Sequence, residues 1–231
     1  MATMQSNQRA VNGVHKELEW AEVAERQGRL VEALRAYHGV LAHTPGEWRA
    51  HLGIGRIALL MGEAERALES FMAVLVQVQT CAEAFRGRAL AFFALGEDSR
   101  ALEDLERALR LCDGDTSEVQ LSLGCVLNDL GRSHEAMGHL RTVWDRNPGD
   151  PDVALELAYA LAVTGAQQEA RLVLDSVAID AEEPLYVLLQ AEGAAASGAL
   201  GKAAQLRETA LDGDPELAER AEALPHLARL A

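Results

Sequence analysis

Aromatic residues and prolines are both scarce in this sequence. Phe, Trp and Tyr together make up 4% of the 231 residues, and there are six prolines. Strands favour aromatic and β-branched residues, whereas alanine and leucine, which dominate here, favour helices. The composition therefore indicates helices rather than strands.

Long apolar runs are absent as well. The longest, such as ALLMG and ALAFFALG, are far shorter than the roughly 20 residues that a membrane-spanning helix needs. The first residues, MATMQSNQRAVNG, are polar and lack the apolar core of a signal peptide, and no cysteine stands near them to accept a lipid. We therefore expect a cytoplasmic protein that does not insert into a membrane.

Basic residues are outnumbered by acidic ones. The chain has 21 Lys and Arg against 36 Asp and Glu, which gives a formal net charge of −15. Nucleic acids and anionic membranes bind clustered cations, so neither is expected as the main partner. Cys81, Cys112 and Cys125 lack the spacing of metal ligands and are expected to be free thiols.

Glycines recur at a nearly constant interval and mark six copies of one unit. They are separated by 34, 34, 35, 34 and 33 residues. A small residue stands seven positions before each of them, an alanine stands five positions after, and a valine or alanine stands twelve positions after. Aligned columns across six copies indicate an internal repeat rather than an accident of composition. The glycines are Gly28, Gly62, Gly96, Gly131, Gly165 and Gly198.

Each column has a physical reason. A glycine ends the first helix of the unit because it adopts the left-handed conformation without a Cβ penalty. Small residues on either side of it let two antiparallel helices approach closely. Pro45, Pro148 and Pro215 stand where the second helix should stop. The unit is therefore predicted to be a helix, a turn and a second helix.

This pattern resembles the tetratricopeptide repeat (TPR) family. The stretch LGIGRIALLMGEAERALESFMAVL places Gly55, Gly62, Ala67 and Phe71 at the family's G, G, A and F positions. The resemblance covers roughly residues 14–215, and a one-residue insertion at DGDTS lengthens the loop after the third repeat. It implies an all-α fold, a right-handed superhelical solenoid of about six helix-turn-helix TPR units with a C-terminal capping helix. We expect disorder at 1–13, repeats at about 14–47, 48–81, 82–116, 117–150, 151–183 and 184–215, and the cap at 216–231.

Motifs that carry chemistry are missing. The sequence has no Gly-rich phosphate loop, nucleophile elbow, zinc-protease helix or calcium loop. His38, His43 and His51 straddle the turn at Pro45, and His134 and His139 are five residues apart, which is poor helical spacing for joint zinc ligation. We therefore expect no enzymatic activity, no catalytic residues, no cofactor and no metal site.

The resemblance implies that the first helices line a concave groove. Residues about 13, 10, 6, 3 and 2 positions before each glycine are expected to face it. Three arginines in this set cluster in an otherwise acidic chain, beside several apolar residues, and Asn128 could hold the backbone amide of a ligand. The candidate peptide-binding residues are Arg49, Leu52, Arg56, Arg86, Leu90, Phe93, Leu121, Asn128, Leu155 and Tyr159. An alternative stays open, in which the leucines pack between adjacent first helices and the arginines pair with Glu83 or Glu118.

The function expected from this groove is that of an adaptor for a protein partner. Arginines bind carboxylates in a bidentate manner and apolar residues supply affinity, so the expected partner is a peptide or helix with apolar and acidic groups. A carboxylate clamp for chaperone tails is not expected, because Leu18 and Glu22 stand where the clamp needs Lys and Asn. Two alternatives remain: a self-assembling scaffold, in which the tail PELAERAEALPHLARLA enters the groove of the next copy, and a cytoplasmic chaperone for secreted subunits.

Overall fold

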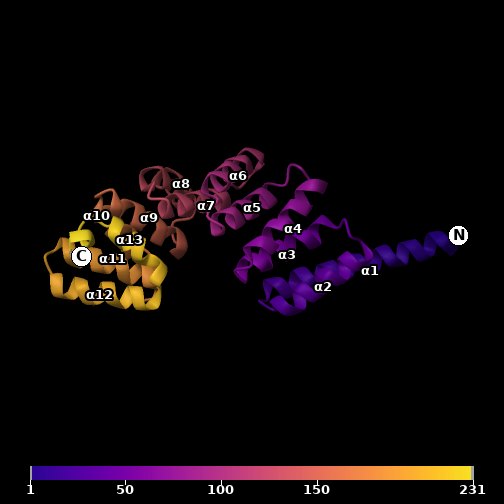
Figure 1. Cartoon of the computed structure of the whole chain (residues 1–231), viewed down its shortest axis with the longest axis horizontal. Helices are drawn as coiled ribbons and strands as arrows, with labels where there is room; N and C mark the ends of the chain where they lie inside the picture. Colours follow the sequence, from indigo (N-terminus) through magenta and orange to yellow (C-terminus); the bar gives the residue numbers. More distant parts are fainter. Residues whose placement is uncertain (1, 230–231) are drawn as a thin grey trace. The chain divides into compact units, whose positions relative to one another are not determined.

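The computed structural model describes residues 2–229 of the chain, and all regular structure among them is helical (Figure 1). The chain divides into two compact units, Met1–Gly114 and Asp115–Ala231. This division falls inside the lengthened loop DGDTS, so each unit contains three of the six repeats. The expected all-α helical repeat architecture is confirmed.

Unit 1 is a stack of three helical hairpins. Each helix packs against the next one in the chain, and the first helices of neighbouring hairpins also touch, α1 against α3 and α3 against α5. We call the exposed face formed by α1, α3 and α5 the inner face of unit 1. The helices are α1 (Ala2–Arg26), α2 (Leu30–His43), α3 (Trp48–Leu60), α4 (Ala64–Gln77), α5 (Ala82–Ala94) and α6 (Asp98–Leu111).

The beginning of α1 differs from the sequence-based expectation. Residues 1–13 are expected to be disordered, whereas α1 includes residues 2–13, and Met1 lies outside the described residues. No proline interrupts this stretch, and its Gln, Arg and Ala residues are compatible with a helix. The helix therefore continues toward the N-terminus beyond the part that packs on α2.

Unit 2 contains three further hairpins and a C-terminal segment. Here α7 touches α9 and α9 touches α11, and the exposed face of these three helices is the inner face of unit 2. We call residues 214–229 the C-terminal segment. The elements are α7 (Ser117–Asp129), α8 (Ser133–Arg146), α9 (Pro151–Val163), α10 (Gln167–Asp175), α11 (Pro184–Ala196), α12 (Leu200–Gly213), η1 (Pro215–Leu217), α13 (Ala218–Ala223) and η2 (Leu227–Arg229).

The repeating glycines end the first helices as predicted. Gly28 has a φ of 72°, and the other five glycines of the column also have positive φ. The residue after each glycine donates its N–H to the carbonyl five positions back, as Arg29 does to Ala24 at 2.9 Å. This bond satisfies a carbonyl that the helix end would otherwise leave unpaired. The turn chemistry therefore accounts for where each first helix stops.

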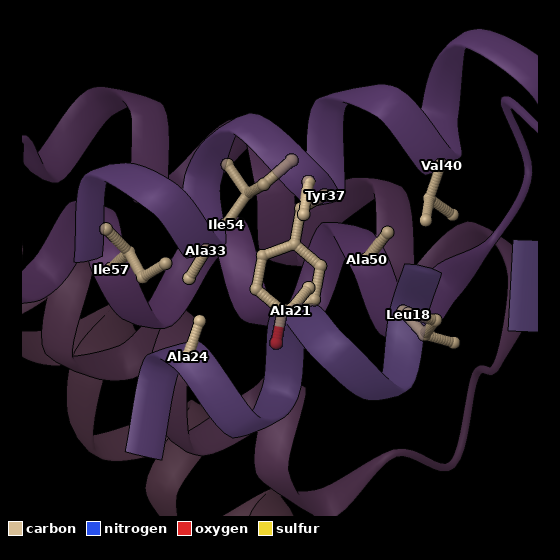
Figure 2. Close-up of a cluster of buried hydrophobic side chains, with 10 residues drawn as sticks. Leu18, Ala21, Ala24, Ala33, Tyr37, Val40, Ala50, Ile54 and Ile57 are labelled. Carbon is tan, nitrogen blue, oxygen red and sulfur yellow. The ribbon is translucent and has the colours of Figure 1, made fainter. Parts of the chain in front are cut away.

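The core of unit 1 lies between the two helices of each hairpin and between successive hairpins (Figure 2). Ala21 and Ala33, members of the two small-residue columns, are fully buried against each other's helices. The ring of Tyr37 lies against Gly53 of the next repeat, where an added Cβ would come within 2.2 Å of its Cζ. Close packing thus extends from one repeat to the next.

Candidate functional site

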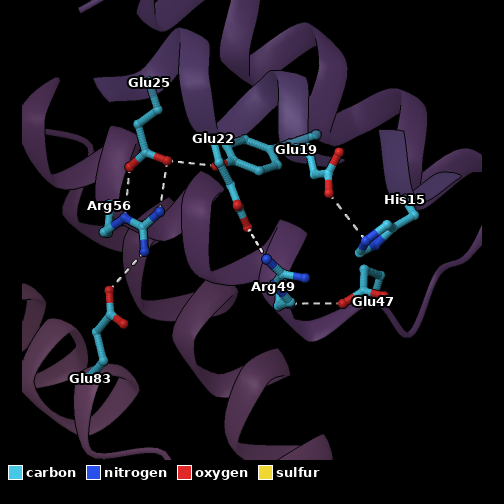
Figure 3. A network of polar contacts seen from close by, with 9 residues as sticks. His15, Glu19, Glu22, Glu25, Glu47, Arg49, Arg56 and Glu83 are labelled. Carbon is cyan, nitrogen blue, oxygen red and sulfur yellow. Dashed lines mark hydrogen bonds and ion pairs between the residues drawn. The ribbon is translucent and has the colours of Figure 1, made fainter. Parts of the chain in front are cut away.

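Arg56 is the centre of an ion-pair network on the inner face of unit 1 (Figure 3). Its Nε and Nη2 donate to the two carboxylate oxygens of Glu25 at 2.6 and 2.7 Å, and its Nη1 donates to Glu83 Oε1 at 2.7 Å. Bidentate pairs of this kind are among the strongest hydrogen bonds in proteins. One arginine therefore ties all three first helices of the unit together.

The carboxylate of Glu25 also accepts a hydrogen bond from the second-helix layer. The hydroxyl of Tyr37 donates to Glu25 Oε2 at 2.6 Å. Burial, with the Glu25 carboxylate beside it, raises the pKa of Tyr37 above its ordinary value. The hydrogen bonds that Arg56 donates to Glu25 raise the pKa of Arg56, although burial acts to lower it. At physiological pH the network therefore combines a charged guanidinium with a neutral tyrosine.

Arg49 makes a second contact between α1 and α3. Its Nη2 donates to Glu22 Oε1 at 2.7 Å, and its backbone N–H donates to Glu47, which caps the start of α3 (Figure 3). The side chains of Arg49 and Glu22 are each partly exposed. Glu22, which stands where a carboxylate clamp needs Asn, is thus already engaged with an arginine.

The structure places the other predicted residues of unit 1 in two environments. Leu52 is buried in the core, whereas Arg86, Leu90 and Phe93 are half-buried on α5. The proposed internal pairing of an arginine with Glu83 is confirmed for Arg56, but its main partner, Glu25, lies on the preceding first helix. Leu60, four residues after Arg56, is 70% exposed and is the most exposed leucine of this face.

In unit 2 the predicted residues are mostly covered. Leu155 and Tyr159 are buried and Leu121 is half-buried. Asn128 is buried, and its Nδ2 donates to the backbone carbonyl of Glu156 at 3.0 Å and to Glu156 Oε2 at 2.9 Å. Its amide therefore joins α7 to α9 instead of facing an open groove.

Arg220 of the C-terminal segment covers this part of the inner face. Its guanidinium donates to Asp129 of α7 at 2.6 Å and to Glu156 of α9 at 3.0 Å, and it lies 4.9 Å from the centre of the Tyr159 ring. Only 11% of its side chain is exposed. Burial acts to lower the pKa of Arg220, but Glu156 and Asp129 outweigh it and raise that pKa. The segment is thus fixed by a desolvated, doubly paired cation.

Glu192 of α11 holds the end of the same segment. Its carboxylate is 0% exposed and accepts hydrogen bonds from the backbone N–H groups of His226 and Leu227 at 2.9–3.2 Å. The His226 ring lies 2.6 Å away through Nδ1, and Gln167 Nε2 donates at 2.9 Å. A buried carboxylate needs such partners, and here most of them come from the C-terminal segment.

The charge pattern of this face was not predicted from the sequence. Glu156 stands nine positions before its glycine, outside the positions expected to face a groove, and Arg220 was expected in a cap at the end of the array. The usable signal was the combination of inward acidic residues such as Glu192 with a tail that carries Arg and His. The tail contacts both helices of the last hairpin, α11 and α12, and it also reaches Asp129 on α7 and Glu156 on α9.

Comparison with protein families gives an independent identification of the repeats. The family model for the tetratricopeptide repeat matches residues 24–91 and 127–193, which together are more than half of the chain. The chain belongs to the tetratricopeptide repeat family. TPR proteins are typically non-enzymatic, and the fold is generally a module for protein–protein interaction.

Similar proteins agree with this fold. Protein CTR9 homolog of Arabidopsis thaliana is 27% identical over 136 residues, and the match spans 58% of this chain but about an eighth, 12%, of that protein. A structure of pilF from Pseudomonas aeruginosa is 18% identical, with a TM-score of 0.69 and coverage of 89% of this chain and 94% of that one. A thermophilic TPR protein of Thermus thermophilus is 20% identical, with a TM-score of 0.60 and coverage of 87% and 98%. At these identities the structures show the shared fold alone.

Two further features of the structure concern metal sites and membrane spans. Among residues 2–229, no group of His, Cys, Asp or Glu has the arrangement of a metal site. Within the same described part of the chain, no helix is both long enough and apolar enough to cross a membrane.

Proposed function

We propose that this TPR chain is a non-enzymatic cytoplasmic adaptor that binds a segment of a partner protein on the inner face of unit 1. The observation that carries the proposal is the position of the C-terminal segment in unit 2. There, a stretch of polypeptide lies on the first helices of three repeats and is held by charged and apolar contacts. Unit 1 has the corresponding first helices, and its face has accessible groups of both kinds.

The accessible groups indicate the chemistry of the partner. Leu60 follows Arg56 by one turn and Arg49 precedes it by two, so the three side chains share one face of α3. A guanidinium has five N–H donors, and the Nη2 contact with Glu22 leaves Arg49 the capacity to bind a second carboxylate. Half-buried Phe93 on α5 adds apolar surface. The proposed partner segment therefore presents an apolar side chain to Leu60 and a carboxylate to Arg49.

A matched pair of variants tests this site. The full-length chain, Leu60→Asp and Val76→Asp are each used to capture proteins from a lysate of the source organism, and the captured proteins are quantified by mass spectrometry. Leu60 is 70% exposed on the inner face and Val76 is 74% exposed on the second helix α4, so neither change disturbs the core.

We expect at least one protein to be captured equally by the unchanged chain and by Val76→Asp, and at least tenfold less by Leu60→Asp. Adding Arg49→Gln should reduce its capture further. Equal capture by the Leu60 and Val76 variants would exclude the inner face of unit 1 as the binding site.

A further inference from the structure

The C-terminal segment has the features of a bound ligand of unit 2. It contacts one acidic residue on each first helix: Asp129 on α7, Glu156 on α9 and Glu192 on α11. Its contacts with these helices combine ion pairs, backbone hydrogen bonds and a cation–π contact. Contacts with an acidic residue on each of three successive first helices place the segment along the inner face of unit 2, where a peptide ligand would lie.

The groups that meet between the segment and the face are complementary in charge, whereas the acidic residues Glu216, Glu219 and Glu222 of the segment are exposed to solvent. The face contributes three carboxylates, whereas the segment contributes the guanidinium of Arg220 and the imidazole of His226. Apolar contacts alternate with these two side chains, because Leu217, Ala221, Leu224 and Leu227 are all buried. The preferred ligand of this face is therefore an Arg followed four residues later by Leu, with a His-Leu pair beyond it. This charge preference is opposite to that of the unit 1 site.

The segment has little structure to hold it in place by itself. Its helices are α13, with six residues, and two 3-10 turns of three residues each, all far below the length at which an isolated helix is stable in water. A turn at Asp214 joins it directly to α12, and such a short tether supplies the segment to the face at an effective concentration on the order of millimolar. A competing segment replaces it when that segment binds the face tightly enough, at its own concentration, to overcome this effective concentration.

We propose that the inner face of unit 2 is a binding site for a leucine-containing segment of a partner protein that presents an arginine to Asp129 and Glu156, and that residues 214–229 occupy it in cis until such a segment displaces them. The site is separate from the face proposed for unit 1, and it takes a partner of opposite charge. Its test is therefore independent of Leu60.

The probe is a fluorescein-labelled synthetic peptide with the sequence of residues 214–231. Its binding is measured by fluorescence polarisation to the full-length chain, to Arg220→Ala and to Arg171→Ala. Arg220→Ala weakens the competitor in cis, so the apparent affinity of the peptide should rise by the factor by which the face becomes available. Arg171 is 82% exposed on α10, and its replacement is the matched control.

We expect the peptide to bind Arg220→Ala at least tenfold more tightly than it binds the unchanged chain or Arg171→Ala. A peptide with Glu in place of Arg220 should bind at least tenfold more weakly than the unchanged peptide. Leu60→Asp should alter neither value. Equal binding of the peptide to the unchanged chain and Arg220→Ala, or equal binding of the two peptides, would overturn the proposal.

Cys125 supplies a second measurement that does not depend on the added peptide. It lies one turn before Asp129 on α7, where burial and nearby Glu156 raise the pKa of its thiol and Arg220 lowers it. Because loss of Arg220 also lowers the thiolate fraction, alkylation by iodoacetamide is followed residue by residue with mass spectrometry over a range of pH, and the rate constant of the thiolate itself should be higher at Cys125 in Arg220→Ala and fall again when the peptide is added. An unchanged rate constant of the thiolate would show that the segment does not cover this face in solution.

Sedimentation of the unchanged chain tests whether the inner face of unit 2 is occupied by the C-terminal segment of a second copy. A monomer at high concentration agrees with occupation in cis. A dimer that the peptide dissociates would assign the face to the C-terminal segment of a second copy and would overturn the proposal of a foreign partner.

Discussion

The ring of Phe71 in α4 occupies the space beside Gly87 in α5, where an added Cβ would lie 2.3 Å from its Cζ. Tyr37 and Gly53 have the same relationship one repeat earlier. In each case the aromatic residue follows its repeat's turn glycine by nine positions, and the opposing glycine precedes the next one by nine. An aromatic ring and a missing side chain therefore fix the distance between successive repeats of unit 1.

Replacing this glycine should destabilise unit 1. Gly87→Ala forces a methyl group into the Phe71 ring, so we expect the free energy of unfolding to fall by about 1–3 kcal/mol. Urea unfolding followed by tryptophan fluorescence measures it, and a Trp144→Phe background leaves Trp20 and Trp48, both in unit 1, as the reporters.

Gly138→Ala is the control for helix propensity. Gly138 lies inside α8 of unit 2, so this control is made in a chain that keeps Trp144 as the reporter; an added Cβ there has nothing within 4 Å, and the replacement should be neutral or stabilising by up to about 1 kcal/mol. Equal effects at Gly87 and Gly138 would show that the ring does not restrict position 87.

The repeat architecture was predictable because its determinants are local and occur six times. A glycine that ends a helix and an alanine at a close helix contact act through backbone conformation and size, and both recur at a fixed spacing. The contact of Phe71 with Gly87 also corresponds to a sequence pattern, an aromatic residue followed by a glycine at a fixed spacing, but the pattern occurs only twice. Later repeats have Ser122, Glu156 and Leu189 at the position equivalent to Gly87.

The ion pairs and the path of the tail were not predictable in the same way. The repeats contain several acidic residues with which Arg56 could pair. Its pairing with Glu25 depends on the register between α1 and α3. The C-terminal segment folds into very short helices, whose position is set by docking of Arg220 and Leu227 rather than by local preference. Sequence periodicity contains no information about such contacts.

Removal of Arg56 should destabilise unit 1 more than removal of a surface arginine. Arg56→Gln deprives Glu25, whose side chain is 12% exposed, of its bidentate partner. We expect a loss of about 1–3 kcal/mol in the free energy of unfolding, with little dependence on salt. Arg29→Gln, which breaks the exposed pair with Glu32, should cost less than about 1 kcal/mol. Similar losses for the two variants would mean that the network adds nothing beyond ordinary surface pairing.

Stability should fall at alkaline pH through the buried tyrosines. Burial, together with Asp129 and Glu156, raises the pKa of Tyr159 to about 12 from 10.0. Between these values the folded chain keeps a proton that the unfolded chain has lost, so the free energy of unfolding decreases as the pH rises. The stabilisation that Tyr159 provides is fully present below pH 10 and is lost as the pH rises toward 12. Over this range one group lowers the free energy of unfolding by up to about 1.4 kcal/mol per pH unit.

The variant Tyr159→Phe isolates this contribution. It keeps the ring under Arg220 and removes the hydroxyl, whose bond to the Arg220 carbonyl is long at 3.4 Å. Urea unfolding by circular dichroism at pH 8, 9, 10 and 11 should show a shallower decline in Tyr159→Phe than in the unchanged chain. Tyr37, whose pKa is also raised, accounts for part of the decline that remains. Parallel curves would rule out Tyr159 as a source of the alkaline loss.

Asn128 should not tolerate an isosteric carboxylate. Its buried Nδ2 donates to both the backbone and the side chain of Glu156, and an aspartate at this position cannot donate when it is ionised. Two carboxylates would then face each other in a desolvated contact between α7 and α9. We expect Asn128→Asp to lower the free energy of unfolding of unit 2 by about 2–4 kcal/mol at pH 7.

The pH dependence of this variant separates charge from shape. Repulsion and burial raise the pKa of the new carboxyl in the folded state. The loss in free energy of unfolding is therefore complete above that pKa. It decreases as the pH falls, because the protonated carboxyl can again donate to Glu156. The measurement is urea unfolding of the variant and the unchanged chain between pH 4 and 7. Asn147→Asp, at an exposed helix end, is the control and should change stability by less than about 1 kcal/mol at either pH. A penalty in Asn128→Asp that does not decrease with falling pH would place its cause in packing and not in the lost donor.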